Sequence, residues 1–511
     1  MVLTAHRCRL LLSVLTDLAV EEVRSGGARL RPGGVPEGVP EGAASRERAV
    51  RLRSALERLG PLYVKLGQVL STRQDLVPEA VAAELESLHD RTTPLPFACL
   101  EPVLEEELGP GWRERFSDLD TRRPLGAASV AQTHAARLRD GRPVVVKVQR
   151  PGVRAVMSTD MRLLSTAVRL LARRTPLLNA TVDFSAMLHV VFDAMRHELD
   201  FTLEAANMDA ARRAVAPYGL LRVPETVLVT PRVLVQTRAP GVSIRDADAG
   251  SLAPEVRGEI GGQLLTFMCQ QYLLDRAFHA DPHPGNVFVA PDGVTTLIDW
   301  GMVGRIDRHL SLALAMTLLG LAANDAQIVA RNWPEMGRPM PWADLAGFHQ
   351  DMTILVPALH NVPLERLRFG ASLASLLKYS TARGIQTNPM IGLLSKSFSN
   401  IEGSVRLVAP RLSVTEVLVR SVPRVVRAFT REALSEQHLG YQALQALALG
   451  ENLLRDLRTV TRSLAGGELT VQIMPVQRRF SLAEHHDALR HRRLTRAALA
   501  ASALWWWRRR R

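Results

Sequence analysis

Apolar residues recur at helical spacing through the first part of the chain. Between 46 and 70 they form a leucine-rich stripe at intervals of three and four, which predicts a helix that Gly60 and Pro61 interrupt. The same spacing predicts helices over 79–89 and 97–108. We therefore expect this part of the chain to be helical.

The pattern changes to period two in the next part of the chain. Apolar and polar residues alternate over 130–138 and 143–148, on either side of an Asp-Gly turn, and again over 223–229 and 232–236. Alternation with β-branched residues is typical of antiparallel strands. These four segments predict a small β-rich region.

Helical spacing returns towards the C-terminus. It predicts a long helix over 254–277 and further helices after residue 301, including apolar runs at 310–323 and 370–377. Strands followed by helices, rather than strict alternation of the two, indicate an α+β fold.

The ends of the chain differ from the middle. Residues 10–23 have the pattern of a short amphipathic helix. Pro and Gly then alternate over 31–45, which predicts a flexible linker. Residues 467–473 have the pattern of a short strand.

The C-terminal segment combines apolar and basic residues. From 478 to 511 there are ten Arg against Glu484 and Asp487, so +8 of the +13 net charge lies there. Three Trp at 505–507 precede four Arg, which predicts a helix on an anionic membrane surface. The apolar part, 497–507, is shorter than the roughly 20 residues of a spanning helix. A packed helix with a solvated Arg tail is the alternative.

Composition narrows the class of protein. A chain of 511 residues can hold two to four domains. Cys8, Cys99 and Cys269 are too widely spaced for a disulfide framework or a zinc site, which favours a reducing, cytoplasmic setting. With the basic tail, we expect a cytoplasmic protein that is peripherally associated with the membrane. Since the charge lies in the tail and not on a folded domain, we expect no nucleic-acid partner.

Lysine is rare in this chain. It occurs only at 65, 147, 378 and 396, and every other Lys or Arg position is Arg. A lysine ammonium is a compact, rotatable point charge that the planar Arg fork does not replace on a phosphate or a buried carboxylate. Lys65 and Lys147 both lie in the motifs described next.

A polar cluster is predicted around Asp281. Asn286 follows it by five residues, and the strand patterns 287–289 and 295–298 form a hairpin that returns Asp299 to the same place. Their oxygens suit Mg²⁺ with bound phosphates, and H-x-D-x-x-x-x-N followed by D-x-G has protein-kinase spacing. Asp281 would take a proton while Asn286 and Asp299 hold the metal. A His- and Asp-rich turn between strands is the alternative.

Two further residues fit a phosphoryl-transfer site. Lys147 lies in a Val-rich strand, like the kinase lysine that holds the α- and β-phosphates. Glu204 lies on a predicted helix over 196–207 and is the chosen ion-pair partner of Lys147. At about 100° per residue, Asp200 and Asn207 share its face. A surface lysine with a buried stem and an exposed helix carboxylate are the alternatives.

The loop before the first strand and the first helical segment carry weaker signals. Ala127, Ala128 and Ser129 occupy the place of a Gly-rich nucleotide loop. Lys65 and Gln68, in K-x-G-Q, share one helix face. Taken alone, K-x-G-Q fits a solvated helix face equally well.

Together these motifs resemble the UbiB/AarF/ADCK family of atypical kinase-like proteins over about residues 46–440. The resemblance rests on K-x-G-Q, the Ala-rich loop, Val146-Lys147-Val148, Glu198-Leu199-Asp200 with Glu204, the Asp281 loop and Asp299-Trp300-Gly301. It implies a two-lobed kinase-like fold with a β-rich N-lobe, a helical C-lobe and an N-terminal helical extension. The domain boundaries are then 1–45, 46–123 (extension), 124–239 (N-lobe), 240–450 (C-lobe) and 451–511 (basic, apolar tail).

The resemblance also assigns ligands and partners. It implies that ATP and Mg²⁺ bind, with Ala127, Ala128, Ser129 and Lys147 on the nucleotide. In the family the K-x-G-Q segment covers the nucleotide site and meets the E-x-D carboxylates, so Lys65 and Gln68 would approach Glu198 and Asp200. This arrangement would obstruct a peptide substrate. The family is linked to membranes, to isoprenoid quinone (ubiquinone) biosynthesis, and to ATP hydrolysis or kinase-like activity.

Three functions are compatible with these features. The first is an atypical kinase or ATPase that acts in quinone or lipid metabolism at the membrane. The second is a soluble phosphotransferase of the aminoglycoside-kinase type, which the K-x-G-Q segment and the Ala-rich loop disfavour. The third is a non-catalytic, nucleotide-responsive scaffold. A quinone or isoprenoid lipid is a candidate partner, and a homodimer is one oligomeric state that stays open.

Overall fold

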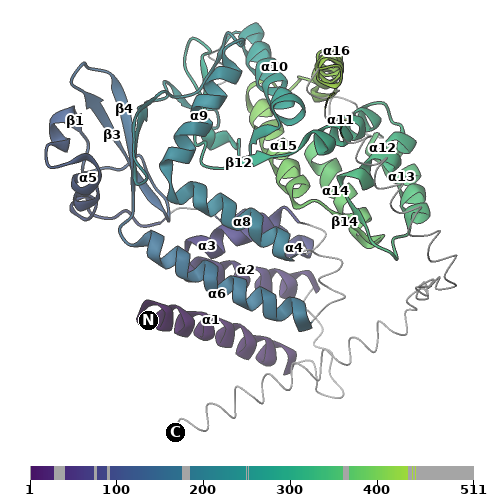
Figure 1. Cartoon of the computed structure of the whole chain (residues 1–511), viewed down its shortest axis with the longest axis horizontal. Helices are drawn as coiled ribbons and strands as arrows, with labels where there is room; N and C mark the ends of the chain where they lie inside the picture. The colour runs from purple at the N-terminus through teal and green to yellow at the C-terminus, as the bar shows by residue number, and fades with distance from the viewer. Residues whose placement is uncertain are drawn as a thin grey trace. The chain divides into compact units, whose positions relative to one another are not determined.

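A computed structural model describes residues 2–27, 41–73, 77–88, 92–174, 184–248, 250, 252–360 and 368–435, together with 440 and 444. The chain divides into two units, Met1–Leu439 and Gly440–Arg511. The fold described below is that of the first unit (Figure 1). The predicted strand at 467–473 and the predicted membrane-surface helix lie outside the described residues.

Four helices form the N-terminal extension. They are α1 (Val2–Gly27), α2 (Glu41–Leu59), α3 (Pro61–Ser71) and α4 (Glu79–Glu86). The predicted interruption at Gly60-Pro61 separates α2 from α3, and the amphipathic helix predicted over 10–23 is the central part of α1. The linker predicted over 31–45 is wrong for 41–45, since α2 already begins at Glu41. Its other residues lie outside the described part of the chain.

The extension is tightly packed around a glycine. A Cβ on Gly67 would lie 2.3 Å from Leu88 Cδ1 and 2.9 Å from Leu56 Cδ1, so α3 approaches α2 and the end of α4 more closely than a larger residue allows. Buried apolar side chains such as Leu62 and Leu85 fill the contact. This part of the chain is therefore one packed body.

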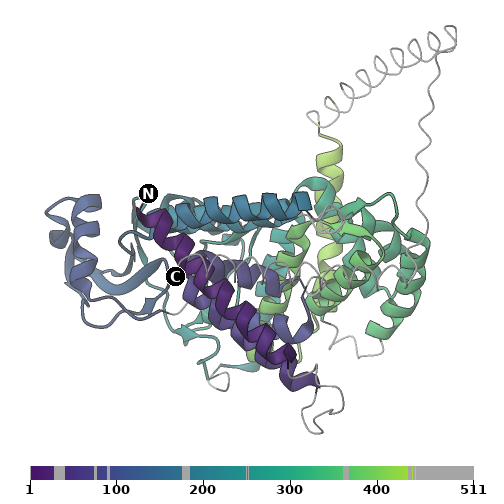
Figure 2. The ribbon, with the colours of Figure 1, turned by 90° about the horizontal axis from the view of Figure 1, so that it is seen from below.

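α1 lies beside α6 (Val153–Arg174) and α2, as Figures 1 and 2 show. Arg7 of α1 donates from Nε to Asp160 Oδ1 of α6 at 2.7 Å and from Nη2 to the Leu59 carbonyl of α2 at 2.5 Å. Arg7 and Asp160 are both buried, and burial raises the pKa of Asp160 while Arg7 lowers it. One buried ion pair thus joins three helices.

The N-lobe is an antiparallel sheet with the strand order β1-β3-β4-β7-β6, and β2 pairs with β3. The elements of this lobe are η1 (Phe97–Cys99), α5 (Glu101–Leu108), η2 (Trp112–Arg115), β1 (Phe116–Leu119), β2 (Gly126–Ala127), β3 (Ala131–Leu138), β4 (Pro143–Gln149), β6 (Thr226–Val229) and β7 (Val233–Thr237). All four predicted strands are present, with boundaries that differ by up to three residues.

The alternation of side chains between the two faces of β4 determines the side of the sheet on which Lys147 lies. Val144, Val146 and Val148 point into an apolar core with residues of β7 and α5. Because successive side chains of a strand point to opposite faces, Lys147 points away from that core. It pairs in register with Thr133 of β3 and Leu234 of β7.

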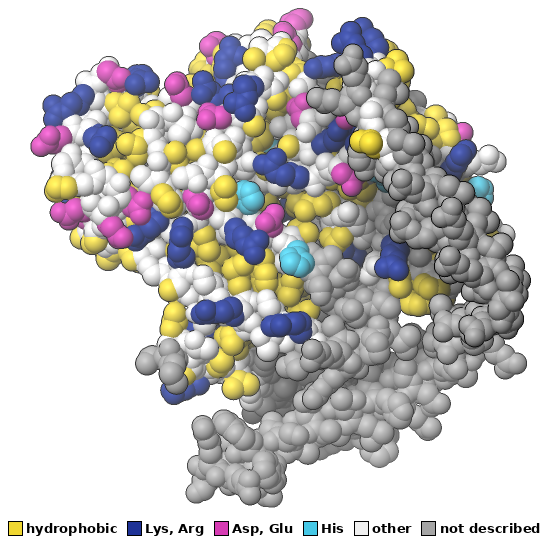
Figure 3. All heavy atoms as spheres, in the orientation of Figure 1, with side chains coloured by type: hydrophobic (Ala, Val, Ile, Leu, Met, Phe, Trp, Pro, Cys, Tyr) yellow, Lys and Arg dark blue, Asp and Glu magenta, His cyan; other side chains and the backbone are white. Residues whose placement is uncertain are grey.

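Acidic and basic side chains are interspersed over the surface of this β-rich lobe (Figure 3). Several form exposed ion pairs, among them Arg113–Glu101 at 2.6 Å and Arg142–Asp140 at 2.7 Å. Exposed pairs contribute about 0–1 kcal/mol each. The stability of the lobe therefore comes mainly from the valine core of its sheet.

The prediction of one continuous helix over 196–207 is wrong, because the helix is interrupted at Asp200. α8 (Phe184–Leu199) ends before it and α9 (Phe201–Val215) begins after it. Asp200 has an extended backbone and its carboxylate accepts from the Thr202 N–H and hydroxyl at 3.0 and 2.6 Å. Asp is a strong N-cap residue, so this side chain starts a new helix.

The C-lobe contains a small sheet and a set of helices. Its sheet has the order β5-β11-β10-β8, and β9 pairs with β12. The first half comprises β5 (Leu221–Arg222), β8 (Val242–Ser243), α10 (Pro254–Gln270), η4 (Gln271–Asp275), β9 (Ala277–His279), η5 (Pro284–Asn286), β10 (Val287–Val289), β11 (Thr295–Leu297) and β12 (Val303–Arg305).

The helix predicted over 254–277 is too long. It ends at Gln270, a π-turn follows over Gln271–Asp275, and Arg276 takes a left-handed conformation with φ 54°. The chain then enters β9, whose pairing with β12 needs an extended backbone. This turn directs the loop after His279 towards the N-lobe side of the C-lobe.

The second half of the C-lobe is mainly helical. It comprises α11 (Arg308–Ala322), α12 (Ala326–Asn332), η6 (Trp333–Met336), β13 (Gly337–Pro339), α13 (Leu345–His360), α14 (Phe369–Ala382), β14 (Ile385–Thr387), α15 (Pro389–Val408) and α16 (Val414–Ala433). α15 packs against α10 and α14 and supplies fully buried residues such as Ile391, Leu394 and Ile401. One face of α15 contacts the loop after β9, which brings it to the site.

Candidate functional site

The predicted ion pair between β4 and α9 is present. Lys147 Nζ lies 3.0 and 2.9 Å from the two oxygens of Glu204, and 3.5 Å from Asp299 Oδ1. Glu204 is only 2% exposed, so the pair is shielded from water. Burial lowers the pKa of Lys147, but the Glu204 and Asp299 carboxylates outweigh it and the net pKa is raised. Lys147 is therefore a fixed positive charge at neutral pH.

The predicted hairpin brings Asp299 back beside Asn286. β10 pairs with β11 from Val287–Leu297 to Val289–Thr295, and the Ile298 N–H donates to the Asn286 carbonyl at 2.9 Å. Asp299 itself has φ 62°. A left-handed conformation at a residue other than glycine is strained, and such strain concentrates at functional sites.

His279 joins the start of the Asp281 loop to the backbone just before Asp299. Its ring is fully buried, with Nε2 3.0 Å from the Ile298 carbonyl, and Nδ1 accepts from the Asp281 N–H at 3.1 Å. Burial lowers the pKa of His279, so the ring is neutral with its proton on Nε2. We had assigned no role to this histidine from the sequence. Its place two residues before Asp281, in H-x-D, was the available signal.

Asp281 has two partners that sequence reasoning missed. Asn400 Nδ2 donates to Asp281 Oδ1 at 2.6 Å, and Lys396 Nζ lies 3.4 Å from Oδ2. Burial raises the pKa of Asp281, but Lys396 and other nearby positive groups outweigh it and the pKa is lowered. The carboxylate is therefore ionised at neutral pH. Its charge is held by α15, 115 and 119 residues further along the chain.

The K-x-G-Q helix reaches the site through its lysine. Lys65 Nζ lies 2.5 Å from Glu198 Oε1, as expected for the E-x-D carboxylate. Gln68 lines the cavity but donates to the Leu88 carbonyl at 3.1 Å. Asp200 caps α9 and is not among the residues that line the cavity. The extension therefore meets the N-lobe at Lys65 and Glu198, and not through all four predicted residues.

The Ala-rich loop is a tight turn that other segments hold. The Ala128 N–H donates to the Ala131 carbonyl at 2.8 Å, and the Ala128 carbonyl accepts from Thr92 and Arg150. Of the three predicted nucleotide-loop residues, Ala128 lines the cavity, whereas Ala127 and Ser129 do not. Since its N–H is already used, Ala128 contributes shape to the site rather than a donor to phosphate.

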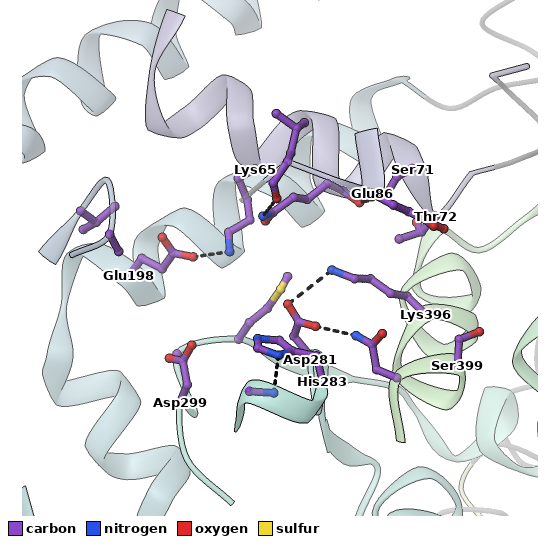
Figure 4. A pocket seen from close by; sticks show the side chains of 18 of the residues that line it. Lys65, Ser71, Thr72, Glu86, Glu198, Asp281, His283, Asp299, Lys396 and Ser399 are labelled. Atoms are coloured by element: carbon purple, nitrogen blue, oxygen red, sulfur yellow. Dashed lines mark hydrogen bonds and ion pairs between the residues drawn. The ribbon is translucent and has the colours of Figure 1, made fainter. Parts of the chain in front are cut away.

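These groups surround one cavity of ≈ 740 Å³. Figure 4 shows Lys65 and Glu198 on one side, Asp299 and Asp281 on another, and Lys396 of α15 facing Asp281. The volume falls in the usual range for small-molecule sites, about 300–1,000 Å³. Asp281 and Asp299 lie on its wall, whereas Glu204 and Asn286 are buried next to them, Glu204 beside Lys147 and Asn286 beside the Asp281 backbone.

The donor set fits Mg²⁺ with a nucleoside triphosphate. Asp299 offers a carboxylate, and Asn286 donates through Nδ2 to the Asp281 carbonyl at 3.0 Å, which leaves its oxygen as the ligating end. Partial removal from water raises the pKa of Asp299, whose side chain is 53% exposed, but Lys147 outweighs this effect and the pKa is lowered. Within the described residues no three His, Cys, Asp or Glu side chains form a metal cluster. Mg²⁺ commonly takes its other ligands from phosphates and water.

Comparison with known proteins places the chain in a family. The model of the ABC1 atypical kinase-like domain matches residues 87–333. A probable protein kinase UbiB of Azotobacter vinelandii is 35% identical over 392 residues, which is 74% of this chain and 71% of that protein. The chain belongs to the ABC1 atypical kinase-like family. The family resemblance drawn from the motifs is thereby confirmed, as is the two-lobed α+β fold.

A second UbiB protein and one solved structure are also similar to this chain. A probable protein kinase UbiB of Pseudomonas fluorescens is 33% identical over 428 residues, covering 80% of this chain and 77% of that protein. Among solved structures, the complex of Rv3197 with erythromycin from Mycobacterium tuberculosis matches 72% of this chain and 98% of that chain, at 24% identity and a TM-score of 0.47. The similarity to the two UbiB proteins makes this chain a UbiB-type atypical kinase-like protein.

Within the described part of the chain, no helix has the length and apolar character needed to cross a bilayer.

Proposed function

We propose that this protein binds Mg²⁺ and ATP in the cavity and transfers the γ-phosphoryl group to a small acceptor or to water. The observation that carries the proposal is that Lys147 Nζ lies 2.9 Å from Glu204 and 3.5 Å from Asp299, in the wall that also holds Asp281. A lysine held by a glutamate, next to an aspartate on a kinase-spaced loop, is the set that phosphoryl transfer uses.

Each residue has a distinct part in the proposed reaction. Lys147 donates to the α- and β-phosphates, and Glu204 keeps its ammonium oriented. Asn286 and Asp299 would hold Mg²⁺, which when bound neutralises charge on the β- and γ-phosphates. Asp281, ionised and held by Asn400, orients the attacking hydroxyl or water and accepts its proton.

The position of the extension favours a small molecule over a peptide as the phosphoryl acceptor. α3, the Thr72 that follows it, and α4 contribute Lys65, Ser71, Thr72 and Glu86 to the cavity wall that faces Asp281. An extended peptide would have to pass these side chains to reach Asp281. A small molecule or water is therefore the acceptor that we propose.

The proposed setting is isoprenoid quinone or lipid metabolism at a membrane surface. Support comes from membership of the ABC1 family and from the similarity to proteins named UbiB. The basic, Trp-containing segment at 478–511 is the proposed contact with anionic lipid. A quinone or isoprenoid lipid is the proposed partner, and the proposed location is the cytoplasmic membrane surface.

Replacement of the metal-binding carboxylate tests the enzymatic proposal. Asp299→Asn should lower Mg²⁺-dependent ATP turnover by at least about 100-fold, since loss of one preorganised charged group commonly has that effect. Asp246→Asn, at an exposed aspartate of the same lobe, is the matched control and should keep full turnover. Turnover by Asp299→Asn at the rate of the control would overturn the proposal.

The cellular setting is tested with the same variants. A strain that lacks the protein is expected to show an altered quinone or lipid profile, which Asp246→Asn restores and Asp299→Asn does not. If Asp299→Asn restored the profile, a non-catalytic scaffold role would be favoured over the enzyme.

A further inference from the structure

One face of α15 is bonded to the loop that carries Asp281. Ser397 Oγ donates to the His279 carbonyl at 2.6 Å, and Ser404 Oγ donates to the Pro282 carbonyl at 3.0 Å. Both serines are fully buried. The backbone of α15 beside these serines is therefore held in a fixed position relative to the loop that carries Asp281.

Lys396 and Asn400 lie on this bonded face. Asn400 Nδ2 holds Asp281 Oδ1 at 2.6 Å, while Lys396 Nζ lies at 3.4 Å from Oδ2. Both side chains line the cavity, and Figure 4 shows the Lys396 ammonium directed towards Asp281 from the side opposite Asp299. The lysine side chain is 22% exposed.

The three lysines of the cavity differ in how closely they are paired. Lys65 lies 2.5 Å from Glu198, and Lys147 lies 2.9 Å from Glu204. Both carboxylates belong to α8 or α9. Lys396 makes a longer contact, 3.4 Å, and its partner is the aspartate that faces the acceptor. Lys396 is therefore the lysine that pairs with the aspartate at the proposed point of attack.

The distances bring Lys396 within reach of the transferred group. Asp281 must approach the attacking oxygen to about 2.6–3.2 Å, and that oxygen must lie about 3–3.5 Å from phosphorus before reaction. A cation 3.4 Å from the same carboxylate can therefore contact the oxygens of the γ-phosphoryl group by rotation of its side chain. A rotatable point charge is what a lysine supplies.

We propose that Lys396 is a further catalytic residue, which donates to the γ-phosphoryl oxygens of bound ATP and stabilises the charge that they carry during transfer. In the transfer the bond from the γ-phosphorus to the bridging oxygen breaks and its electron pair leaves with ADP. The acceptor oxygen bonds to phosphorus and its proton passes to Asp281. This inference rests on the proposed function and adds to it a cation from the C-lobe.

The test distinguishes a contact of Lys396 with the γ-phosphate from a general loss of nucleotide affinity. Titration calorimetry with Mg²⁺ would measure the affinity of the full chain for ADP and for the non-hydrolysable analogue β,γ-imido-ATP. Lys396→Met should weaken binding of the analogue by about 10- to 100-fold, the worth of one hydrogen bond to a charged group. Binding of ADP should be unchanged, and ATP turnover should fall by about 100-fold or more.

Two further variants serve as controls. Lys378→Met removes the same charge from an exposed position on the neighbouring helix α14 and should leave both affinities unchanged. Lys396→Arg keeps the charge and should recover part of the analogue affinity. If Lys396→Met does not fold, Lys396→Gln is measured in its place.

The outcomes are distinct. If Lys396→Met lost affinity for ADP and for the analogue equally, or lost neither, the proposed role of Lys396 would be overturned. The proposal that the unchanged protein binds ATP would still stand. Failure of the unchanged protein to bind either nucleotide would overturn the proposed function and this inference together.

Discussion

Burial and charged neighbours together set the charge of single residues in the site. Lys147 and Asp281 each keep their charge because an oppositely charged side chain outweighs the effect of burial on the pKa. The neutral His279 does the opposite, since burial removes its charge and leaves one donor and one acceptor for the backbone. A neutral His279 and a charged Asp281 therefore lie two positions apart on the same loop.

Sequence alone identified the residues in motifs and missed those outside them. Lys147, Glu204, Asn286 and Asp299 lie at spacings that one chemistry explains, so their meeting could be predicted. Lys396 belongs to no recognised motif, and 115 residues separate it from Asp281. Its one signal was that a chain which otherwise uses Arg has a lysine there.

Glu402 should make stability depend on pH. This buried residue of α15 accepts from the Phe369 N–H at 2.8 Å, and burial raises its pKa from 4.5 to about 7. Because the pKa is raised in the folded state, the contribution of Glu402 to stability is greatest below pH 4.5 and is lost as pH rises through 7. Glu402→Gln, which cannot ionise, should be more stable than the unchanged protein at pH 8.5, by up to about 3 kcal/mol.

Urea unfolding at pH 5 and pH 8.5 checks this prediction. The difference between Glu402→Gln and the unchanged protein should shrink strongly at pH 5, where the glutamate is already protonated. Glu105→Gln, at an exposed position of α5, should show no such change between the two pH values. A stability difference that does not depend on pH would contradict the assignment.

Elements follow the sequence pattern where local signals agree and depart from it where tertiary contacts decide. The hairpin at 287–297 was predictable because alternation flanks a turn sequence. The break at Asp200 was not, because helix-forming residues continue on both sides and only a capping bond divides α8 from α9. The end of α10 at Gln270 likewise depends on the pairing of β9 with β12, which lies outside the local pattern.

The contact between α1 and α6 gives a prediction at the scale of elements. Arg7→Ala should leave Asp160 buried without its guanidinium and destabilise the protein by about 3 kcal/mol or more. The double variant Arg7→Met with Asp160→Asn removes both charges and should recover part of the loss. Thermal unfolding of the three proteins measures this, and a double variant less stable than Arg7→Ala would contradict it.

At the scale of the whole first unit, the extension, the N-lobe and the C-lobe all contribute walls to one cavity. The extension is joined to the N-lobe by Lys65 and Glu198 and to the Ala-rich loop by Thr92, whose N–H donates to the Ala127 carbonyl at 3.1 Å. The contact between the extension and the N-lobe was predicted only from the resemblance to the family. Taken alone, K-x-G-Q also fits a solvated helix. Contact between segments 133 residues apart has no local signal.

Removal of the Lys65 contact should loosen the extension. Lys65→Ala should speed hydrogen exchange of the α3 amides by about 5- to 30-fold, since a charge-assisted bond contributes about 1–2 kcal/mol to their protection. Mass spectrometry resolves this against α9, whose exchange should be unchanged. Lys65→Arg, which keeps the charge, should exchange more slowly than Lys65→Ala. Equal exchange by all three proteins would show that the ion pair does not hold the extension in place.

The distribution of lysine also has a consequence for chemical modification of the protein. Three of the four lysines in the chain line the cavity, and the fourth, Lys378, lies exposed on α14. Reagents that acylate primary amines therefore have few targets, most of them within reach of a bound ligand. The pattern of modification would report occupancy of the cavity directly, without any engineered label.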